Sequence, residues 1–198
     1  MTRRVLVVHA HPDPASFSRA LCDLVVRVSG EVGNEVRVHD LYDVGFSPVV
    51  SANEWSLRGA APDTKPHLAP FFEDVMWCDT LVFAYPTWWS GQPAVLKAWI
   101  DRVLANDVAW SLDDTTGHVM PALRNVTRIV VVTTHGRSKS ANLFCGRAGR
   151  AVIMRSVRRL CSWRCRARWL ALYSVDRSTR FERDRFMQRV ERVLRRIS

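Results

Sequence analysis

The sequence predicts an α/β fold in which a parallel sheet of five strands carries helices on both of its faces. Five short apolar runs are spread along the chain, and stretches with helical spacing separate them. Strands that alternate with helices form βαβ units and therefore a parallel sheet. Uninterrupted apolar runs such as VLVV are typical of a sheet that is buried on both faces. The predicted strands are Arg4–His9, Asn34–His39, Thr80–Tyr85, Thr127–Thr134 and Arg168–Tyr173.

The predicted helices follow from capping residues and from apolar residues at helical spacing. Two prolines forbid a helix before Ser16, which is a good N-cap, and the helical pattern then runs to Gly30. After the third strand, one apolar stripe is formed by Val95, Leu96, Trp99, Ile100, Val103 and Leu104. Further helices are predicted near Asn53–Arg58, over Leu68–Trp77, from Gly146 to about Leu160, and from Ser178 onward. Otherwise, residues 41–70 are expected to be irregular and residues 105–124 to form a loop.

Length and composition indicate one domain over residues 1–198. A chain of this size can bury roughly 70% of its unfolded surface. The N-terminal MTRR leads at once into a strand, and no stretch reaches the length of a membrane-spanning segment. Five cysteines, an odd number without a C-x-x-C pair, are expected to be reduced thiols. We therefore expect a cytoplasmic protein without a transmembrane segment.

The net charge of +10 is unevenly distributed, since sixteen Arg and only four acidic residues lie from Arg147 onward. Nucleic acid, an anionic membrane surface and a phosphate-bearing small molecule are all candidate partners for such a tail. The chain has only three Lys, so Arg also serves wherever a solvated cation is needed. Charge alone does not decide between these interpretations, and no motif for docking on nucleic acid is present.

The economical strand order for five such strands is 2-1-3-4-5. In this order the loops after the first, third and fourth strands surround the switch point, which is the place where the strand order reverses. These loops read HAHPDPASFS, YPTWWSGQP and TTHGRSKSAN. The first loop lacks both G-x-G-x-x-G and G-K-[ST]. It instead offers His11, the hydroxyls of Ser16 and Ser18, and a helix N-terminus, which together suit a phosphate or pyrophosphate. His9 and His11 lack a carboxylate or Cys at a useful spacing, so we expect no metal site.

The second and third loops supply candidate walls for a flat ligand. Trp88 and Trp89 could form one wall, with the backbone N–H groups around Thr87 directed at the polar edge of the ring. Their alternative role is as aromatic residues of the core or of a subunit interface. Thr133, Thr134, His135 and Gly136 would close the opposite side, although His135 could equally be a loop residue without a role.

Together, HAHPDPASFS, YPTWWSGQPAVLKAWIDRV and TTHG resemble the flavodoxin-like NAD(P)H:quinone oxidoreductase family. The resemblance covers roughly Val5 to Gly136, with a weaker tail, and its most specific part is the W-W-S-G-x-P-A-x-L-K-x-W-x-D-R-V block. It implies a single flavodoxin-like domain, a three-layer sandwich with strand order 2-1-3-4-5. It also implies a homodimer that holds FAD or FMN at a site completed by the partner subunit.

The resemblance also implies roles for particular residues. His11, Ser16, Phe17 and Ser18 would hold the phosphate and ribityl side of the flavin. Pro86, Thr87, Trp88 and Trp89 would lie along the isoalloxazine, and Thr134, His135 and Gly136 would bind its pyrimidine end. The implied reaction is ping-pong: hydride passes from NAD(P)H to the flavin, and a quinone or similar small acceptor then takes the electrons in the same pocket.

The sequence departs from the family's pattern after the fourth-strand loop. Quinone reductases place a Tyr and a His there, whereas this chain reads RSKSANLFCGRAGR. Arg137 or Lys139 could stabilise the reduced flavin instead, because a cation lowers the energy of a developing anion. The Arg-rich tail could recruit the 2′-phosphate of NADPH. The alternative function is that of a flavin-binding regulatory subunit of a transporter or other complex, with the basic tail as its contact surface.

Overall fold

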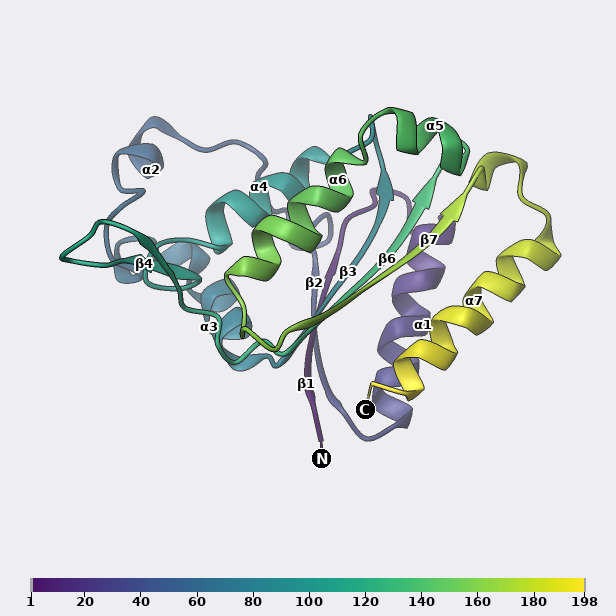
Figure 1. The fold of residues 1–198 in the computed structure, drawn as a ribbon, viewed down its shortest axis with the longest axis horizontal. Helices are drawn as coiled ribbons and strands as arrows, with labels where there is room; N and C mark the ends of the chain where they lie inside the picture. The colour runs from purple at the N-terminus through teal and green to yellow at the C-terminus, as the bar shows by residue number, and fades with distance from the viewer. Residues whose placement is uncertain (1, 198) are drawn as a thin grey trace.

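The protein folds as three layers, with one central sheet between two sets of helices (Figure 1). The computed structural model describes residues 2–197. Five strands form the parallel sheet in the order β2-β1-β3-β6-β7, which is the predicted order 2-1-3-4-5 once the five strands are counted along the chain. They are β1 (Arg4–His9), β2 (Glu35–Asp40), β3 (Thr80–Thr87), β6 (Arg128–His135) and β7 (Arg166–Tyr173).

Two helices cover one face of the sheet, and three helices cover the other. The first face carries α1 (Phe17–Glu31) and α7 (Arg180–Arg195), which lie side by side in Figure 1. The opposite face carries α3 (Ala69–Trp77), α4 (Ala94–Val103) and α6 (Ala148–Ala151), the last of which continues into the π-helical turn η3 (Val152–Val157). The short elements are α2 (Ala52–Ser56), η1 (Pro62–Thr64), η2 (Pro66–Leu68), α5 (Lys139–Phe144) and η4 (Val175–Arg177).

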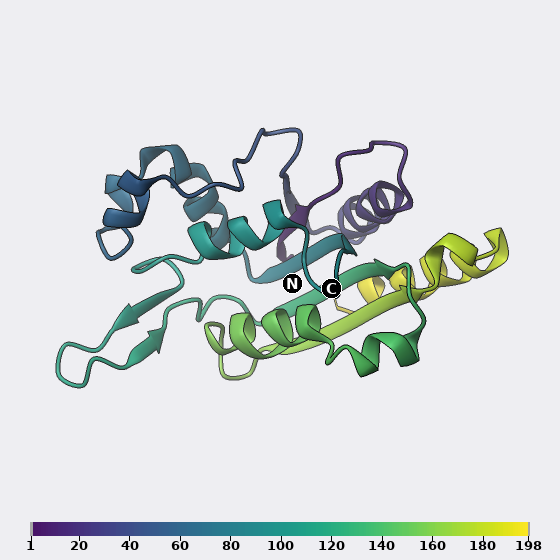
Figure 2. The ribbon, with the colours of Figure 1, turned by 90° about the horizontal axis from the view of Figure 1, so that it is seen from above.

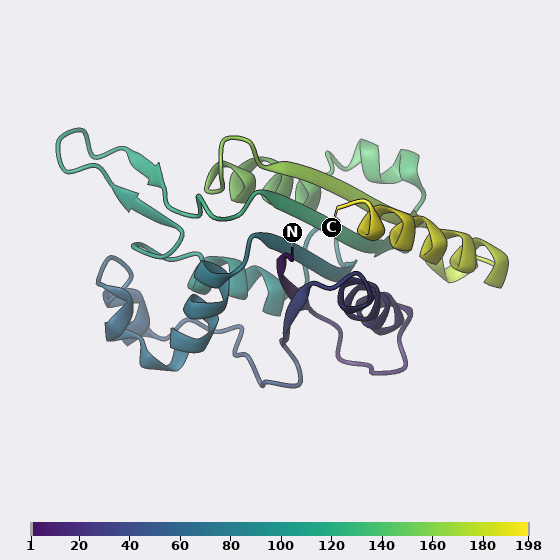
Figure 3. The same ribbon diagram turned by 90° about the horizontal axis from the view of Figure 1, so that it is seen from below.

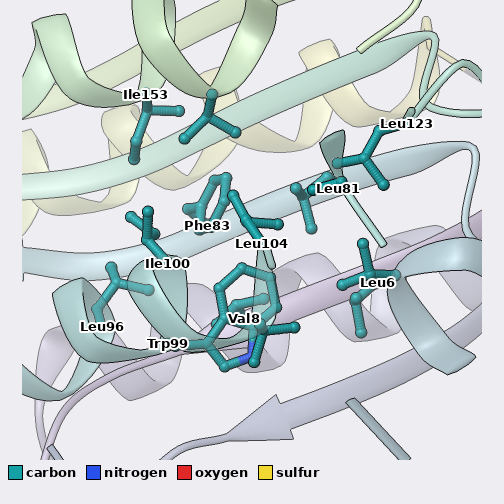
Figure 4. Packing of buried hydrophobic residues seen from close by; sticks show 14 of the residues in the cluster. Leu6, Val8, Leu81, Phe83, Leu96, Trp99, Ile100, Leu104, Leu123 and Ile153 are labelled. Atoms are coloured by element: carbon teal, nitrogen blue, oxygen red, sulfur yellow. The ribbon is translucent and has the colours of Figure 1, made fainter. Parts of the chain in front are cut away.

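Alternation along each strand divides the core into two clusters. Leu6, Val8, Leu81 and Phe83 point to the α3–α4–α6 face, where they meet the fully buried Trp99 of α4 (Figure 4). The residues between them in sequence point to the α1–α7 face. Both faces are therefore apolar at the centre of the sheet, which explains why the inner strands β1, β3 and β6 read as continuous apolar runs.

The structure differs from the sequence prediction at several boundaries. The segment 105–124, predicted as a loop, contains an antiparallel hairpin of β4 (Trp110–Leu112) and β5 (Val119–Pro121). This hairpin projects from one end of the molecule (Figure 2). The loop after the fourth strand contains α5, and the helix predicted from Gly146 begins at Ala148. The last helix, predicted from Ser178, begins at Arg180, and its N-cap Thr179 forms a capping box with Glu182.

Strand β3 is two residues longer than predicted and β6 is shifted by one residue toward the C-terminus, which changes the setting of several candidate residues. Pro86 and Thr87 are the last residues of β3, where they pair in register with Thr134 and His135 of β6. Four residues predicted to flank a ligand are therefore held by the sheet. Of the candidate residues in these two segments, Trp88, Trp89 and Gly136 lie beyond the strand ends.

Candidate functional site

A cleft of about 430 Å³ lies at the carboxyl edge of the sheet, where the ends of β1, β3 and β6 meet. This is the position at which open α/β sheets bind ligands. We call it the sheet-edge cleft. Its lining residues are His11, Ser16, Phe17, Ser18, Pro86, Thr87, Trp88, Thr134, Gly136, Val175, Asp176 and Arg183.

The N-terminus of α1 forms the anion-binding end of the cleft. The hydroxyl of Ser16 accepts the N–H of Arg19 at 3.1 Å, while no acceptor is found for the N–H groups of Phe17 and Ser18 in the described part of the chain. The first turn carries no acidic side chain. Unpaired N–H groups and the helix dipole together favour a negatively charged ligand here.

His11 lines the same end of the cleft. Its Nδ1 lies 3.0 Å from the backbone nitrogen of Asp13 and 3.2 Å from the carbonyl oxygen of Asp13, while Nε2 has no hydrogen-bond partner among the described residues. The ring also meets Trp88 edge to face, with centroids 6.3 Å apart. His11 therefore presents a ring nitrogen without a partner beside the aromatic wall of the cleft.

Arg183 supplies the cation at this end. Its Nε donates to the Ser178 hydroxyl at 2.8 Å and its Nη2 to the Val175 carbonyl at 3.1 Å, and the guanidinium lies over the ring of Phe17. Among the described residues it has no carboxylate partner. A fixed guanidinium without a counter-charge is suited to a phosphate.

The opposite wall is built on a strained two-residue turn. Trp88 and Gly91 bond to each other through both backbone pairs, and between them Trp89 and Ser90 have φ of 47° and 62°. Two positive φ values define a type I′ turn, which is costly for residues with side chains. The turn is braced by Gly149 of α6, where an added Cβ would lie 3.0 Å from the Gly91 Cα and the Ser90 oxygen.

Gly136 lets the loop after β7 approach the cleft. An added Cβ on Gly136 would lie 2.8 Å from an Asp176 carboxylate oxygen. Asp176 thereby brings an acceptor to the mouth of the cleft, which suits a hydroxyl or N–H donor of a ligand.

His135 is not among the residues that line the cleft. Its ring is buried, stacks on Tyr173 with centroids 4.6 Å apart, and contacts Thr87 Oγ1 at 3.4 Å and the Asn142 amide at 3.2 Å. Burial lowers the pKa of His135 to about 4, so the ring is neutral at ordinary pH. Its neutral ring supports the end of β3.

The structure gathers most of the predicted site residues and separates four. His11, Ser16, Phe17, Ser18, Pro86, Thr87, Trp88, Thr134 and Gly136 line one cleft. The side chain of Trp89 is fully exposed at the tip of its turn, and Arg137 is exposed just after Gly136. His135 does not line the cleft, and Lys139 lines a different cavity.

The sequence analysis missed Val175, Asp176 and Arg183. They lie in the loop after β7 and in the first part of α7, whereas the predicted site residues come only from the loops after the first, third and fourth strands. The fifth strand is parallel to the others, so its loop also leaves the sheet at the carboxyl edge. The direction of this strand could therefore have predicted that residues of its loop contribute to the site.

Another cavity, of about 500 Å³, lies between α2, α4 and β4, lined in part by Trp55, Arg102 and Trp110. It is distant in the fold from the strand ends, and the guanidinium of Arg102 is already paired with Glu54 at 2.7 Å and 2.9 Å. The sheet-edge cleft is the better candidate because it lies at the carboxyl ends of the strands and includes the unpaired backbone donors at the N-terminus of α1.

The fold and the cleft define an α/β protein with a candidate ligand site at the switch point of its sheet. The chain belongs to the family described by a flavodoxin-like fold, whose model matches residues 3–197. It is 32% identical over 123 residues to an uncharacterized NAD(P)H oxidoreductase of Haemophilus influenzae, covering 61% of this chain and 58% of the relative. It is 31% identical over 126 residues to ribosyldihydronicotinamide dehydrogenase [quinone] of Mus musculus, covering 56% and 54%. The chain thus spans little more than half the length of these relatives.

Solved structures share the whole fold. Smu.1420 from Streptococcus mutans has a TM-score of 0.83 at 26% identity, with 97% of this chain and 98% of that chain covered. An NAD(P)H:quinone oxidoreductase from Methanothermobacter marburgensis has a TM-score of 0.82 at 24% identity, with both chains fully covered. The second likeness supports the fold alone. None of the helices described here is long and apolar enough to cross a membrane.

Proposed function

We propose that this protein is a flavin-dependent oxidoreductase that passes hydride from NAD(P)H to a quinone or a similar small acceptor. FMN or FAD would occupy the sheet-edge cleft. The observation that carries the proposal is the pairing of an anion-binding end with an aromatic wall in one cleft. The names of the relatives, which include NAD(P)H oxidoreductases and quinone dehydrogenases, support the same reaction class.

The residues present fit the phosphate side of a flavin. The N–H groups of Phe17 and Ser18, the Nε2 of His11 and the guanidinium of Arg183 would donate to phosphate oxygens. Asp176 would accept from a hydroxyl of the ribityl or ribose chain. Cavities of roughly 300–1,000 Å³ hold most cofactors and small ligands, and this cleft lies in that range.

The residues at the other end fit the ring. When bound, a flavin supplies the hydride-transfer chemistry, and the protein orients it and sets its electrostatic surroundings. The ends of β3 and β6 would position the ring edge through Pro86, Thr87 and Thr134, with Trp88 beside it. Because His135 is neutral and buried, it would fix Thr87 without adding charge.

Arg137 is our candidate for stabilising the reduced ring, since it directly follows Gly136 of the cleft. The related prediction for Lys139 has less support, because Lys139 lines a separate cavity. Both roles remain predictions. If replacement of both residues by Gln leaves the rate of flavin reduction by NAD(P)H unchanged, neither cation has this role.

We also propose that the active form is a homodimer with the site at its interface. Trp89 is fully exposed beside the cleft, and Phe144 of α5 is 94% exposed. Large exposed aromatic side chains of this kind mark interaction surfaces. A partner subunit that covers Trp89 would also close the aromatic wall. We further propose that residues 1–198 form one domain and that the protein works in the reducing cytoplasm, which suits its five free cysteines.

Flavin binding to matched Arg variants tests the proposal. Arg183→Gln removes a cleft cation, and Arg180→Gln removes an equal charge from a 97% exposed position on the same helix. Hydrogen bonds to charged groups contribute about 1.5–3 kcal/mol. We therefore expect R183Q to weaken flavin affinity roughly 10- to 100-fold. Fluorescence titration that shows equal affinity for R183Q and R180Q would place the flavin phosphate elsewhere.

A further inference from the structure

The most basic segment of the chain lacks counter-charges. Between Gly136 and Val175 the sequence contains nine Arg and one Lys but no Asp or Glu. Within residues 2–197, none of these ten cations forms an ion pair, whereas Arg19 and Arg195 each pair with more than one carboxylate. The positive charge of this segment is therefore uncompensated.

Four cations surround one cavity at the free edge of the sheet. The cavity, of about 230 Å³, is lined by Lys139, Arg147, Arg150, Trp169, Ala171, Tyr173 and Arg189. We call it the β7 cavity, since Trp169, Ala171 and Tyr173 of β7 are part of its lining. Strand β7 is the outermost strand of the sheet (Figure 3). Lys139 lies on α5 and Arg147 in the turn before α6, while Arg150 lies on α6 and Arg189 on α7. Like charges converging from four places repel one another unless an anion lies between them.

Two of the lining residues also have unpaired buried donors. Arg147 Nε and Trp169 Nε1 are both inaccessible to solvent, and neither finds an acceptor among the described residues. Buried N–H groups are nearly always paired in native proteins, so each exception calls for an explanation. A bound oxyanion would supply acceptors at this place.

Arg147 is also held in a strained backbone conformation. Its φ of 52° lies in the left-handed region, and it directly follows Gly146, whose φ is 74°. A side chain at positive φ costs free energy and is concentrated at ligand-binding sites. The turn thus holds the Arg147 side chain against the cavity at a conformational cost.

We propose that the β7 cavity binds a phosphate group. The planar fork of Arg matches the oxygens of phosphate, and Lys139 adds a point charge. At about 230 Å³ the cavity is smaller than most cofactor sites, so it accommodates the phosphate and not a whole nucleotide. It shares no lining residue with the sheet-edge cleft. The phosphate is either the free ion or a group carried by a larger molecule, such as the 2′-phosphate of NADPH.

Calorimetric titration of inorganic phosphate into the flavin-loaded protein tests the proposal, at constant ionic strength. The bound flavin keeps phosphate out of the sheet-edge cleft. Arg150→Gln removes an exposed cation of the β7 cavity, and Arg164→Gln removes an equal charge from an exposed position outside it. We expect one phosphate to bind to wild type and to R164Q with equal affinity, and R150Q to weaken binding roughly tenfold.

The proposal is overturned if the wild-type protein does not bind phosphate, or if R164Q weakens phosphate binding as much as R150Q does. Lys139→Gln provides a second variant should R150Q fold poorly. If the protein retains no flavin, the same titration is run in the R183Q background, so this proposal is judged separately from the proposed function. Displacement of phosphate by NADP⁺ but not by NAD⁺ identifies the 2′-phosphate as the source. Binding of phosphate without displacement by either identifies the free ion or another phosphate carrier.

Discussion

At the scale of single residues, the glycine at position 149 has a structural role that the sequence does not reveal. Its backbone N–H donates to Ser90 at 2.9 Å, its carbonyl accepts from Gln92 at 2.7 Å, and it has no room for a side chain. It therefore connects α6 to the turn that carries Trp88 and Trp89. The aromatic wall depends on a residue far from it in sequence.

Substitution of Gly149 by Ala tests this role. The new Cβ would lie 3.0 Å from two backbone atoms, which cannot move aside as a side chain could. We expect G149A to lower the free energy of unfolding by about 1–3 kcal/mol and to weaken flavin binding. Gly59→Ala is the control, because an added Cβ there meets nothing within 4 Å. Chemical denaturation and flavin titration measure both effects, and a G149A protein as stable as G59A would contradict the account.

His135 predicts a pH dependence of stability. Burial lowers its pKa to about 4 from the ordinary 6.5, so between these values the unfolded chain binds a proton that the folded protein does not. Stability from this residue is complete above about pH 6.5 and declines as the pH falls toward 4. We expect a loss of the order of 2 kcal/mol between pH 6.5 and pH 4.

The comparison with His135→Gln isolates this contribution. Burial also lowers the pKa of His9 and His39, so wild type has further sources of acid sensitivity. Denaturation measured from pH 7 to pH 4 should show a smaller decline for H135Q than for wild type. Equal declines would mean that the ring is accessible to protons in the folded state.

At the scale of elements, the inner strands β1, β3 and β6 were predictable because each is a buried apolar run, and β2 because apolar and polar residues alternate along it. Helix α4 was predictable because its apolar stripe is regular. Each strand of the β4–β5 hairpin has only three residues, and α5 has six, so neither shows a clear period. The π-helical turn η3 depends on packing rather than on local pattern. The short elements were therefore not predicted, because they are stabilised by packing against neighbouring elements and not by a local sequence pattern.

The candidate site was likewise predictable only in part. The three predicted loops do supply most of the cleft, because the carboxyl ends of parallel strands meet at one edge. Asp176 and Arg183 reach the cleft only because α7 folds back beside α1, a tertiary contact that the sequence pattern does not encode. The capping box of α7 then fixes where its first turn begins.

Thr179→Ala tests the importance of that capping box. Loss of a side-chain N-cap typically costs about 1 kcal/mol, and α7 packs three buried side chains on the sheet. Ser51→Ala removes the equivalent cap from α2, which has five residues and buries none of them. Urea denaturation should show a larger loss for T179A than for S51A. The reverse order would indicate that α7 is held by packing alone.

At the scale of the whole molecule, the account predicts self-association through the turn that carries Trp89. Trp89→Asp places a charge at a fully exposed tip and removes no contact within one subunit. We expect W89D to shift the protein from dimer toward monomer in sedimentation, with unchanged thermal stability of the subunit. Phe181→Asp, at a 73% exposed position on α7, is the control and should remain dimeric. A monomeric wild type would contradict the proposed dimer.

The central claim is that the sheet-edge cleft holds a flavin that NAD(P)H reduces. Anaerobic mixing of the flavin-loaded protein with NADPH or NADH, followed by visible absorbance, tests it most directly. The account predicts that the flavin bleaches with at least one of the two nucleotides and that its colour returns on addition of a quinone. A bound flavin that stays oxidised with both nucleotides, or a protein that binds no flavin, would contradict it.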